Sequence, residues 1–279
     1  MRQVIIRLKE LMSTTGETPS ALSEYHALWI AFVIFITLTL VILFSDASNK
    51  TTRIIITTAW AVMLIFELLK QFEYSTSVVD EQIKFAYNLG AFPYYFCSTP
   101  LYVFPLAAFM KDGHKRNTAI VFLSTFSVIG GLAIFIVPKS VLSGHVFVDF
   151  QSMLHHGIQI FMGLYLASRY RGLLTREHFL RATHAFLFMS YLAFLLNGAF
   201  VNILHVFGQS TSINLFFISP YQRYVPPLLE GMDIEKLPYP IFVAMYLFLF
   251  IALAYALMRV EKTITEKIRY DKIKDFTNI

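Results

Sequence analysis

A series of apolar runs, each close to the length that crosses a bilayer, constrains this chain more than any other feature. An α-helix needs ~20 apolar residues to span a hydrocarbon core of ~30 Å. Because 56% of the 279 residues are hydrophobic and only 15% are charged, the composition excludes an ordinary soluble globular domain. The runs predict an all-α, polytopic membrane helix bundle of about seven transmembrane helices, and a six-helix version stays open if one run lies in the interface. The expected spans are 27–44, 54–70, 88–110, 118–137, 150–168, 182–206 and 239–258.

The segments that flank these runs divide the chain into three parts. Residues 1–25 mix charged and apolar residues at a spacing typical of a short amphipathic helix on the membrane surface, and we expect no cleavable signal peptide. Residues 26–258 form the helix bundle, and residues 259–279 form a charged cytoplasmic tail. The single cysteine excludes an intramolecular disulfide framework.

The distribution of positive charge predicts the orientation. In seven spans the polar segments alternate between the two sides of the membrane, and the cytoplasmic side carries the excess of lysine and arginine. Of the 23 lysines and arginines, 15 fall on the side of the C-terminal tail and 8 on the side of the N-terminus. The N-terminus is therefore expected outside and the C-terminus in the cytoplasm. No basic block with interleaved aromatic residues indicates nucleic-acid binding.

Polar residues inside the spans gather at one side of the predicted bundle, the side of the N-terminus. Polar side chains are costly in a membrane, so a cluster of them on one side is a site hypothesis. The cluster consists of His26 before the first span, Glu67 in the second, Cys97 in the third, Asp149, Gln151, His155 and His156 in the fifth, and Asn197, Asn202 and His205 in the sixth.

The only cysteine lies in an interrupted span, residues 89–102, which we call the Cys97 segment. Pro93 and Pro100 each remove a backbone hydrogen bond and bend the axis. Such breaks persist in a bilayer where neighbouring groups satisfy the backbone, so the segment is expected to face protein or water. A lone buried cysteine is usually a small, inert hydrophobic residue. A nucleophilic Cys97 needs a histidine within hydrogen-bond reach.

The fifth span offers the bases. Adjacent helical residues point ~100° apart, so His155 and His156 cannot both face one target. Asp149 lies two turns before His156 and could orient an imidazole. The rival hypothesis is a metal site, but the histidines lack the i, i+4 spacing that places two imidazoles on one metal. We therefore predict no metal and no cofactor.

Simpler interpretations stay open for the other candidates. His26 follows a capping serine and could be an interfacial histidine, and Glu67 has Lys70 at i+3, which is typical of a surface ion pair. The Gly130-Gly131 pair indicates close helix packing. Residues 207–238 are too long for a tight turn, so we interpret them as a lid or partly inserted hairpin over the polar cluster.

The order of these motifs resembles the YwaF-like integral membrane proteins over residues 24–258. Members carry a Pro-x-x-x-Cys-Ser segment, a later His-Gly at the start of a span, an Asn-containing span, and a Ser-Pro loop before the last helix. The chain departs from the family in its extra His155 and in having tyrosine ahead of the cysteine where members often have histidine. The matching residues are His26, Pro93 to Ser98, His156-Gly157, Asn197, Asn214 to Pro220, and Pro238-Tyr239-Pro240.

The family is related to animal multipass acyltransferases that move a fatty acyl chain between phospholipids through a cysteine. The resemblance therefore implies Cys97 as the nucleophile, His156 as the general base and a membrane phospholipid as the substrate. Asn197 is a candidate to stabilise the oxyanion, and Glu67 and Asp149 are candidates to orient the histidine. The alternatives are a transporter whose broken helix binds a solute, or a non-catalytic membrane protein with a lipid pocket.

Overall fold

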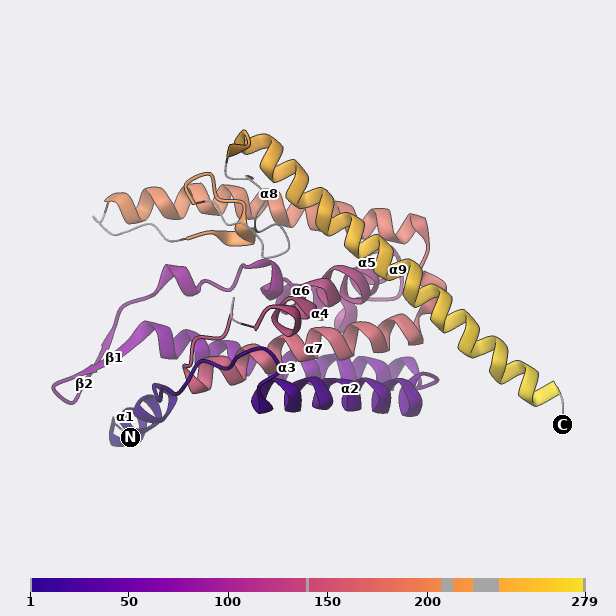
Figure 1. The fold of residues 1–279 in the computed structure, drawn as a ribbon, viewed down its shortest axis with the longest axis horizontal. Coiled ribbons are helices and arrows are strands. Elements are labelled where there is room, and N and C mark those ends of the chain that lie inside the picture. The colour runs from indigo at the N-terminus through magenta and orange to yellow at the C-terminus, as the bar shows by residue number, and fades with distance from the viewer. Residues whose placement is uncertain (1, 139–140, 207–212, 223–235, 278–279) are drawn as a thin grey trace.

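The computed structural model describes residues 2–138, 141–206, 213–222 and 236–277, with side chains up to residue 267. The described chain is an all-α helix bundle with one small β-hairpin at its N-terminal end. The N-terminus and the hairpin lie at one end of the long axis, and the C-terminal end of the last helix lies at the other (Figure 1).

The first two long helices, α2 (Glu24–Phe44) and α3 (Asn49–Ser75), each pack against α7 (Val146–Arg169). Each begins at a serine whose hydroxyl accepts a backbone N–H of the first turn: Ser23 from His26, and Ser48 from Thr51 at 3.1 Å. Such caps satisfy donors that the helix itself cannot pair. Helix α3 is longer than the expected span at both ends.

The third expected span, 88–110, is helical only in its second half. A two-stranded antiparallel hairpin, β1 (Thr76–Val79) and β2 (Gln82–Phe85), precedes it. Two short 3-10 turns follow, η1 (Leu89–Ala91) and η2 (Phe96–Ser98), before α4 (Pro100–Phe109) begins. Proline is well tolerated in the first turn of a helix, as at Pro100, but it disfavours helical backbone in the residue that precedes it. The Cys97 segment is therefore extended and turned rather than a bent helix.

The fourth span is a continuous helix with a π-helical interruption. It consists of α5 (His114–Phe122), a π segment (Leu123–Ser127) and α6 (Val128–Ile136). In the π segment, Ser124 and Thr125 donate side-chain hydrogen bonds to the carbonyls four residues earlier. Gly163 of α7 (Val146–Arg169) crosses at this point so closely that an added Cβ would overlap Val128 and the Leu123 carbonyl. The irregular turn thus lies where two helices approach most tightly.

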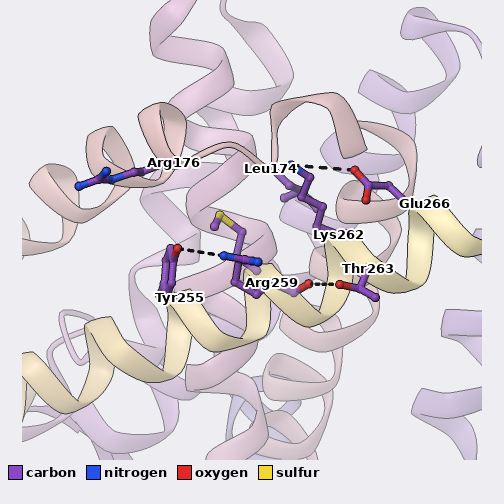
Figure 2. Close-up of a pocket in the computed structure, with 8 residues that line it drawn as sticks. Leu174, Arg176, Tyr255, Arg259, Lys262, Thr263 and Glu266 are labelled. Carbon is purple, nitrogen blue, oxygen red and sulfur yellow. Dashed lines mark hydrogen bonds and ion pairs between the residues drawn. The ribbon is translucent and has the colours of Figure 1, made fainter.

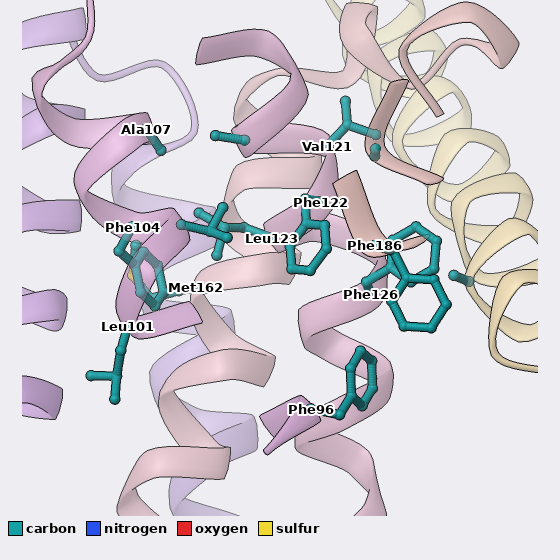
Figure 3. Close-up of a cluster of buried hydrophobic side chains, with 14 of the residues drawn as sticks. Phe96, Leu101, Phe104, Ala107, Val121, Phe122, Leu123, Phe126, Met162 and Phe186 are labelled. Carbon is teal, nitrogen blue, oxygen red and sulfur yellow. The ribbon is translucent and has the colours of Figure 1, made fainter. Parts of the chain in front are cut away.

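Helix α7 lies inside the bundle, and α8 (Arg176–Val206) and α9 (Tyr239–Thr277) cover one side of it, with α9 crossing obliquely (Figure 1). The expected charged tail continues α9 without a break to Thr277. The core of the bundle is aromatic: the ring of Phe126 lies 4.7 Å from that of Phe186, and Phe96 lies 5.6 Å from Phe186 (Figure 3). Phe96 therefore anchors the Cys97 segment in the core.

Five of the described helices are long and apolar enough to cross a membrane, which supports an integral membrane protein. Helix α7 has the necessary length, but two glutamines and two histidines lower its hydropathy, and α4 is too short. The sequence-based expectation of a multi-pass helical bundle is confirmed, while its number of spans is not fixed by these helices. The five are Glu24–Phe44, Asn49–Ser75, His114–Ile136, Arg176–Val206 and Tyr239–Lys267.

The N-terminal helix α1 (Arg2–Met12) is fastened to the end of the bundle. Lys9 lies 2.7 Å from the carboxylate of Glu73 on α3, and His145 Nε2 lies 3.2 Å from the same oxygen. Ile6 and Met12 are buried. An exposed apolar stripe remains on the docked helix at Val4, Leu8 and Leu11, and its contact with a membrane surface stays a prediction.

Candidate functional site

The candidate site is built around the carbonyl of Cys97, which two side chains of α7 hold. His155 Nε2 lies 3.0 Å from this oxygen, and Gln159 Nε2 donates to it at 2.9 Å. His155 and Gln159 are four residues apart, so they lie on the same face of α7. Both are buried. The broken backbone at Cys97 is thus satisfied by protein, as a membrane interior requires.

These hydrogen bonds set the state of both imidazoles. A carbonyl can only accept, so His155 carries its proton on Nε2 and keeps a free lone pair on Nδ1. That Nδ1 is buried without a partner among the described residues. His156 Nδ1 lies 2.7 Å from the Ser152 carbonyl, so its lone pair is on Nε2. Each ring therefore presents one unprotonated nitrogen.

Cys97 forms no disulfide, and the residue as a whole is partly exposed. The contact of His155 is with the backbone oxygen of Cys97, and no hydrogen bond between described residues joins the sulfur to either imidazole. The two histidine rings lie 5.8 Å apart at 61°. The structure thus brings His155, rather than His156, into direct contact with the cysteine residue.

Glu67 extends the polar layer toward α3. Its carboxylate lies 2.8 Å from Lys70 Nζ and accepts from Gln71 at 2.7 Å. Gln151 of α7 approaches the same carboxylate at 3.5 Å. Since only 3% of Glu67 is exposed, this is a buried network and not a surface ion pair. This network reaches α7 at Gln151, one helical turn before His155.

Close packing of α6 against α7 fixes the position of the two histidines along the axis of the bundle. A Cβ on Gly131 would lie 2.8 Å from the carbonyl of His156, and one on Gly130 would lie 3.2 Å from Gln159 Oε1. The expected close packing at the Gly130-Gly131 pair is confirmed. No side chain fits between these two helices, so α7 cannot slide at the level of the site.

A loop covers the Cys97 segment from the side of α8; we call residues 213–222 the covering loop. Phe216 lies 5.7 Å from the ring of Tyr94 and 5.8 Å from Phe96, and Phe217 lies 6.1 Å from Tyr95. Phe216 and Phe217 both adopt left-handed backbone, with φ of 56° and 57°, a costly conformation that packing must hold. The covering loop agrees with the expected lid, of which residues 207–212 and 223–235 lie outside the described residues.

Asn197 holds this covering loop. Its side chain donates to the carbonyl of Leu215 at 3.0 Å and accepts from the N–H of Leu215 at 2.8 Å. Asn197 is fully buried, and these two bonds occupy its amide. It is therefore placed as a support of the covering loop, away from the Cys97 carbonyl. Asn202 and His205 of the same helix are exposed.

Asp149 and His26 lie apart from the site. The carboxylate of Asp149 accepts from the N–H groups of Ser143 at 2.9 Å and Gly144 at 2.8 Å, which ties the preceding loop to α7. His26 Nδ1 accepts from the N–H of Leu22 at 3.1 Å, and its ring stacks on Phe135. Neither contacts an imidazole of α7. Both close the N-terminal end of the bundle.

Gln159 is the contact that sequence reasoning missed. Its position four residues after His155 was the available signal, because the i and i+4 side chains of a helix reach the same target. Within the described part of the chain, no three His, Cys, Asp or Glu side chains gather closely enough to hold a metal ion. Two cavities of the described residues lie elsewhere, one lined by α8 and α9 and the other by α3 and α4.

No protein-family model, no curated protein and no solved structure matches this chain.

Proposed function

We propose that the protein is a membrane-embedded acyltransferase, or acyl hydrolase, that acts on phospholipid acyl chains through Cys97. The observation that carries the proposal is the contact between Cys97 and α7, where an imidazole whose Nδ1 has no partner among the described residues hydrogen-bonds the backbone carbonyl of the only cysteine. A thiol becomes an effective nucleophile when a neighbouring base removes its proton. His155 is the first candidate for that base and His156 the second.

The chemistry needs two proton transfers. The imidazole takes the thiol proton as the Cys97 sulfur attacks the ester carbonyl of a phospholipid; a C–S bond forms and the ester C–O bond breaks. The imidazolium returns the proton to the departing lysophospholipid oxygen. A lysolipid hydroxyl, or water, then attacks the thioester with the imidazole as base, and the thiol is restored. Backbone N–H groups freed between Pro93 and Pro100 are the candidates to stabilise the oxyanion.

A lipid substrate fits the proposed topology. If α4 with the Cys97 segment and the polar helix α7 complete a bundle of seven spans, the termini lie on opposite sides, with the N-terminus outside. Cys97 then lies within the leaflet on the side of the N-terminus, between helices. The resemblance to the YwaF-like family, and through it to cysteine-dependent phospholipid acyltransferases, supports the same reaction.

The test is acyl transfer by the purified protein from an acyl-labelled phospholipid to a lysophospholipid. Cys97→Ala should abolish transfer and the hydroxylamine-sensitive label on the protein. His155→Gln keeps a donor for the Cys97 carbonyl but loses the base, so the rate should fall about 10²-fold or more. His156→Gln, assayed in parallel, identifies which imidazole is the base.

His205→Gln is the matched control, because His205 is an exposed histidine at the end of α8, and it should leave the rate unchanged. Full transfer by Cys97→Ala would exclude the cysteine mechanism.

A second candidate is a non-catalytic membrane protein that binds lipid. The specific observation in its favour is that His155 and Gln159 both satisfy a carbonyl that a broken helix leaves unpaired, which is a structural task. In that case Cys97→Ala and His155→Gln lower the melting temperature in detergent, because each removes buried contacts. No labelled thioester then forms on the wild-type protein.

A further inference from the structure

A cavity that is separate from the Cys97 segment lies where α8 begins and α9 leaves the bundle. Its volume is about 480 Å³, within the range of small-molecule sites. Arg259, on α9, is nine residues beyond Phe250, whose ring contacts Phe96 at 4.8 Å, so the cavity lies ~13 Å along α9 from the Cys97 segment. Its lining residues are Leu174, Arg176, Tyr255, Met258, Arg259, Lys262, Thr263 and Glu266 (Figure 2).

The charge of this lining is positive. Its charged lining residues are three cations, Arg176, Arg259 and Lys262, and a single carboxylate, Glu266. That carboxylate reaches Lys262 only at 3.9 Å. Arg259 donates to the hydroxyl of Tyr255 at 3.4 Å (Figure 2), and neither arginine forms an ion pair with any residue whose side chain is described. The cavity therefore has unused positive charge.

The geometry favours an anion with several oxygens. Arg259 and Lys262 are three residues apart on α9, so their side chains lie on one face, while Arg176 stands at the rim, on the first turn of α8 (Figure 2). A guanidinium binds phosphate through two parallel N–H donors, and an ammonium adds a point charge. The N-terminus of α8 contributes partial positive charge at the same place.

The position of the cavity on α9 indicates what carries the anion. Leu174 and Met258 form its floor and are buried, while the cations stand toward the outside. The position on α9 also fits, because an apolar helix that acquires Arg259 and Lys262 is leaving the hydrocarbon layer. We infer that this cavity binds a phosphate group, most simply that of a lipid in the leaflet on the side of the C-terminus. The inference does not depend on chemistry at Cys97.

The test measures thermal stabilisation of the full-length protein in a neutral detergent. The probes are inorganic phosphate, short-chain phosphatidylglycerol and short-chain phosphatidylcholine, each titrated against wild type and Arg259→Gln/Lys262→Gln. Wild type should gain several degrees in Tm with phosphatidylglycerol, and the double variant should need at least tenfold more lipid for the same shift. A response to inorganic phosphate as well identifies a free phosphate as a sufficient ligand.

Two controls separate binding from folding and from bulk charge. Lys111→Gln/Lys115→Gln removes two exposed charges, one from the loop before α5 and one from its first turn, and should respond as wild type does. Arg259→Lys keeps the charge but loses the two-donor geometry, so its apparent affinity should be intermediate. The inference is overturned if no phosphate probe stabilises wild type, or if both double variants lose the response equally.

Discussion

At the scale of single residues, Asn197 shows how one amide can hold a loop that covers a site. Both of its polar atoms bond the backbone of Leu215, at 3.0 and 2.8 Å, in a fully buried setting. Removal of one partner from a buried hydrogen bond costs more than the bond itself contributes, because the remaining group stays desolvated. Asn197 therefore has a structural role, because it holds the covering loop in place over the Cys97 segment.

Asn197→Ala should lower the free energy of unfolding by ~2–4 kcal/mol, since it leaves an N–H and a carbonyl of Leu215 without partners. The measurement is the melting temperature in detergent, with limited proteolysis of the covering loop as a local readout. Asn202→Ala, on an exposed position of the same helix, should change neither. Equal proteolysis of the two variants would show that Asn197 does not hold the covering loop.

The sequence could identify Cys97 and the two histidines as candidates, but it could not choose between His155 and His156. Adjacent residues of a helix differ by ~100° in direction, and the direction of α7 is fixed by its neighbours. The tight contact of Gly131 with the His156 carbonyl turns His155 toward Cys97. The partners of Asp149 and His26 could not be predicted either, because they are backbone N–H groups of loops, whose positions depend on the fold.

At the scale of helices, the structure depends on glycines where α7 crosses its neighbours, Gly131 at the crossing with α6 and Gly163 at the crossing with the π segment. The nearest atoms to a Cβ on Gly131 would be the His156 carbonyl at 2.8 Å and Ile160 at 2.9 Å. For Gly198, on α8, no atom of the described residues lies within 4 Å of the same position, so these residues make no close approach like that at Gly131. Gly131 and Gly198 therefore form a matched pair for substitution.

Gly131→Ala should destabilise the protein by ~1–3 kcal/mol, because overpacking forces α6 away from α7. Gly198→Ala should be neutral or stabilising by up to ~1 kcal/mol, since alanine has the higher helix propensity. Melting temperatures in the same detergent test the pair. If Gly131→Ala also shifts the His155 ring, acyl transfer should fall in this variant and not in Gly198→Ala. Equal stability of the two would contradict the close packing.

The helices that could be predicted from the sequence are those that coincide with one long, uninterrupted apolar run, such as α2 (Glu24–Phe44) and α8 (Arg176–Val206). The Cys97 segment and the hairpin could not, because apolar content is the same in a helix and in an extended segment buried by protein. The hairpin turn also lacks glycine: Asp80 and Glu81 adopt left-handed φ of 50° and 54°, which side chains only infrequently tolerate.

At the scale of the whole molecule, the two ends of the bundle differ in their chemistry. The end that holds α1 and the hairpin carries the buried network around Glu73 and, one layer below, Cys97 with its histidines. The opposite end carries the exposed cations and the α8–α9 cavity. Such polarity is expected of a protein with a fixed orientation, since anionic lipid headgroups attract the cationic end.

This orientation gives a direct prediction, because Cys97→Ala removes the only cysteine and leaves a background for single probes. Asp80→Cys at the hairpin turn should react with a membrane-impermeant maleimide on intact cells, and Lys115→Cys should react only after permeabilisation. Both positions are exposed, so a difference in labelling reports the side of the membrane rather than burial. Labelling of both on intact cells would place the hairpin and the α4–α5 loop on the same side and would exclude a membrane-crossing path through the Cys97 segment and α4. Reversed labelling would preserve that crossing but invert the molecule, which would put Cys97 in the cytoplasmic leaflet and require a cytoplasmic lipid as its substrate.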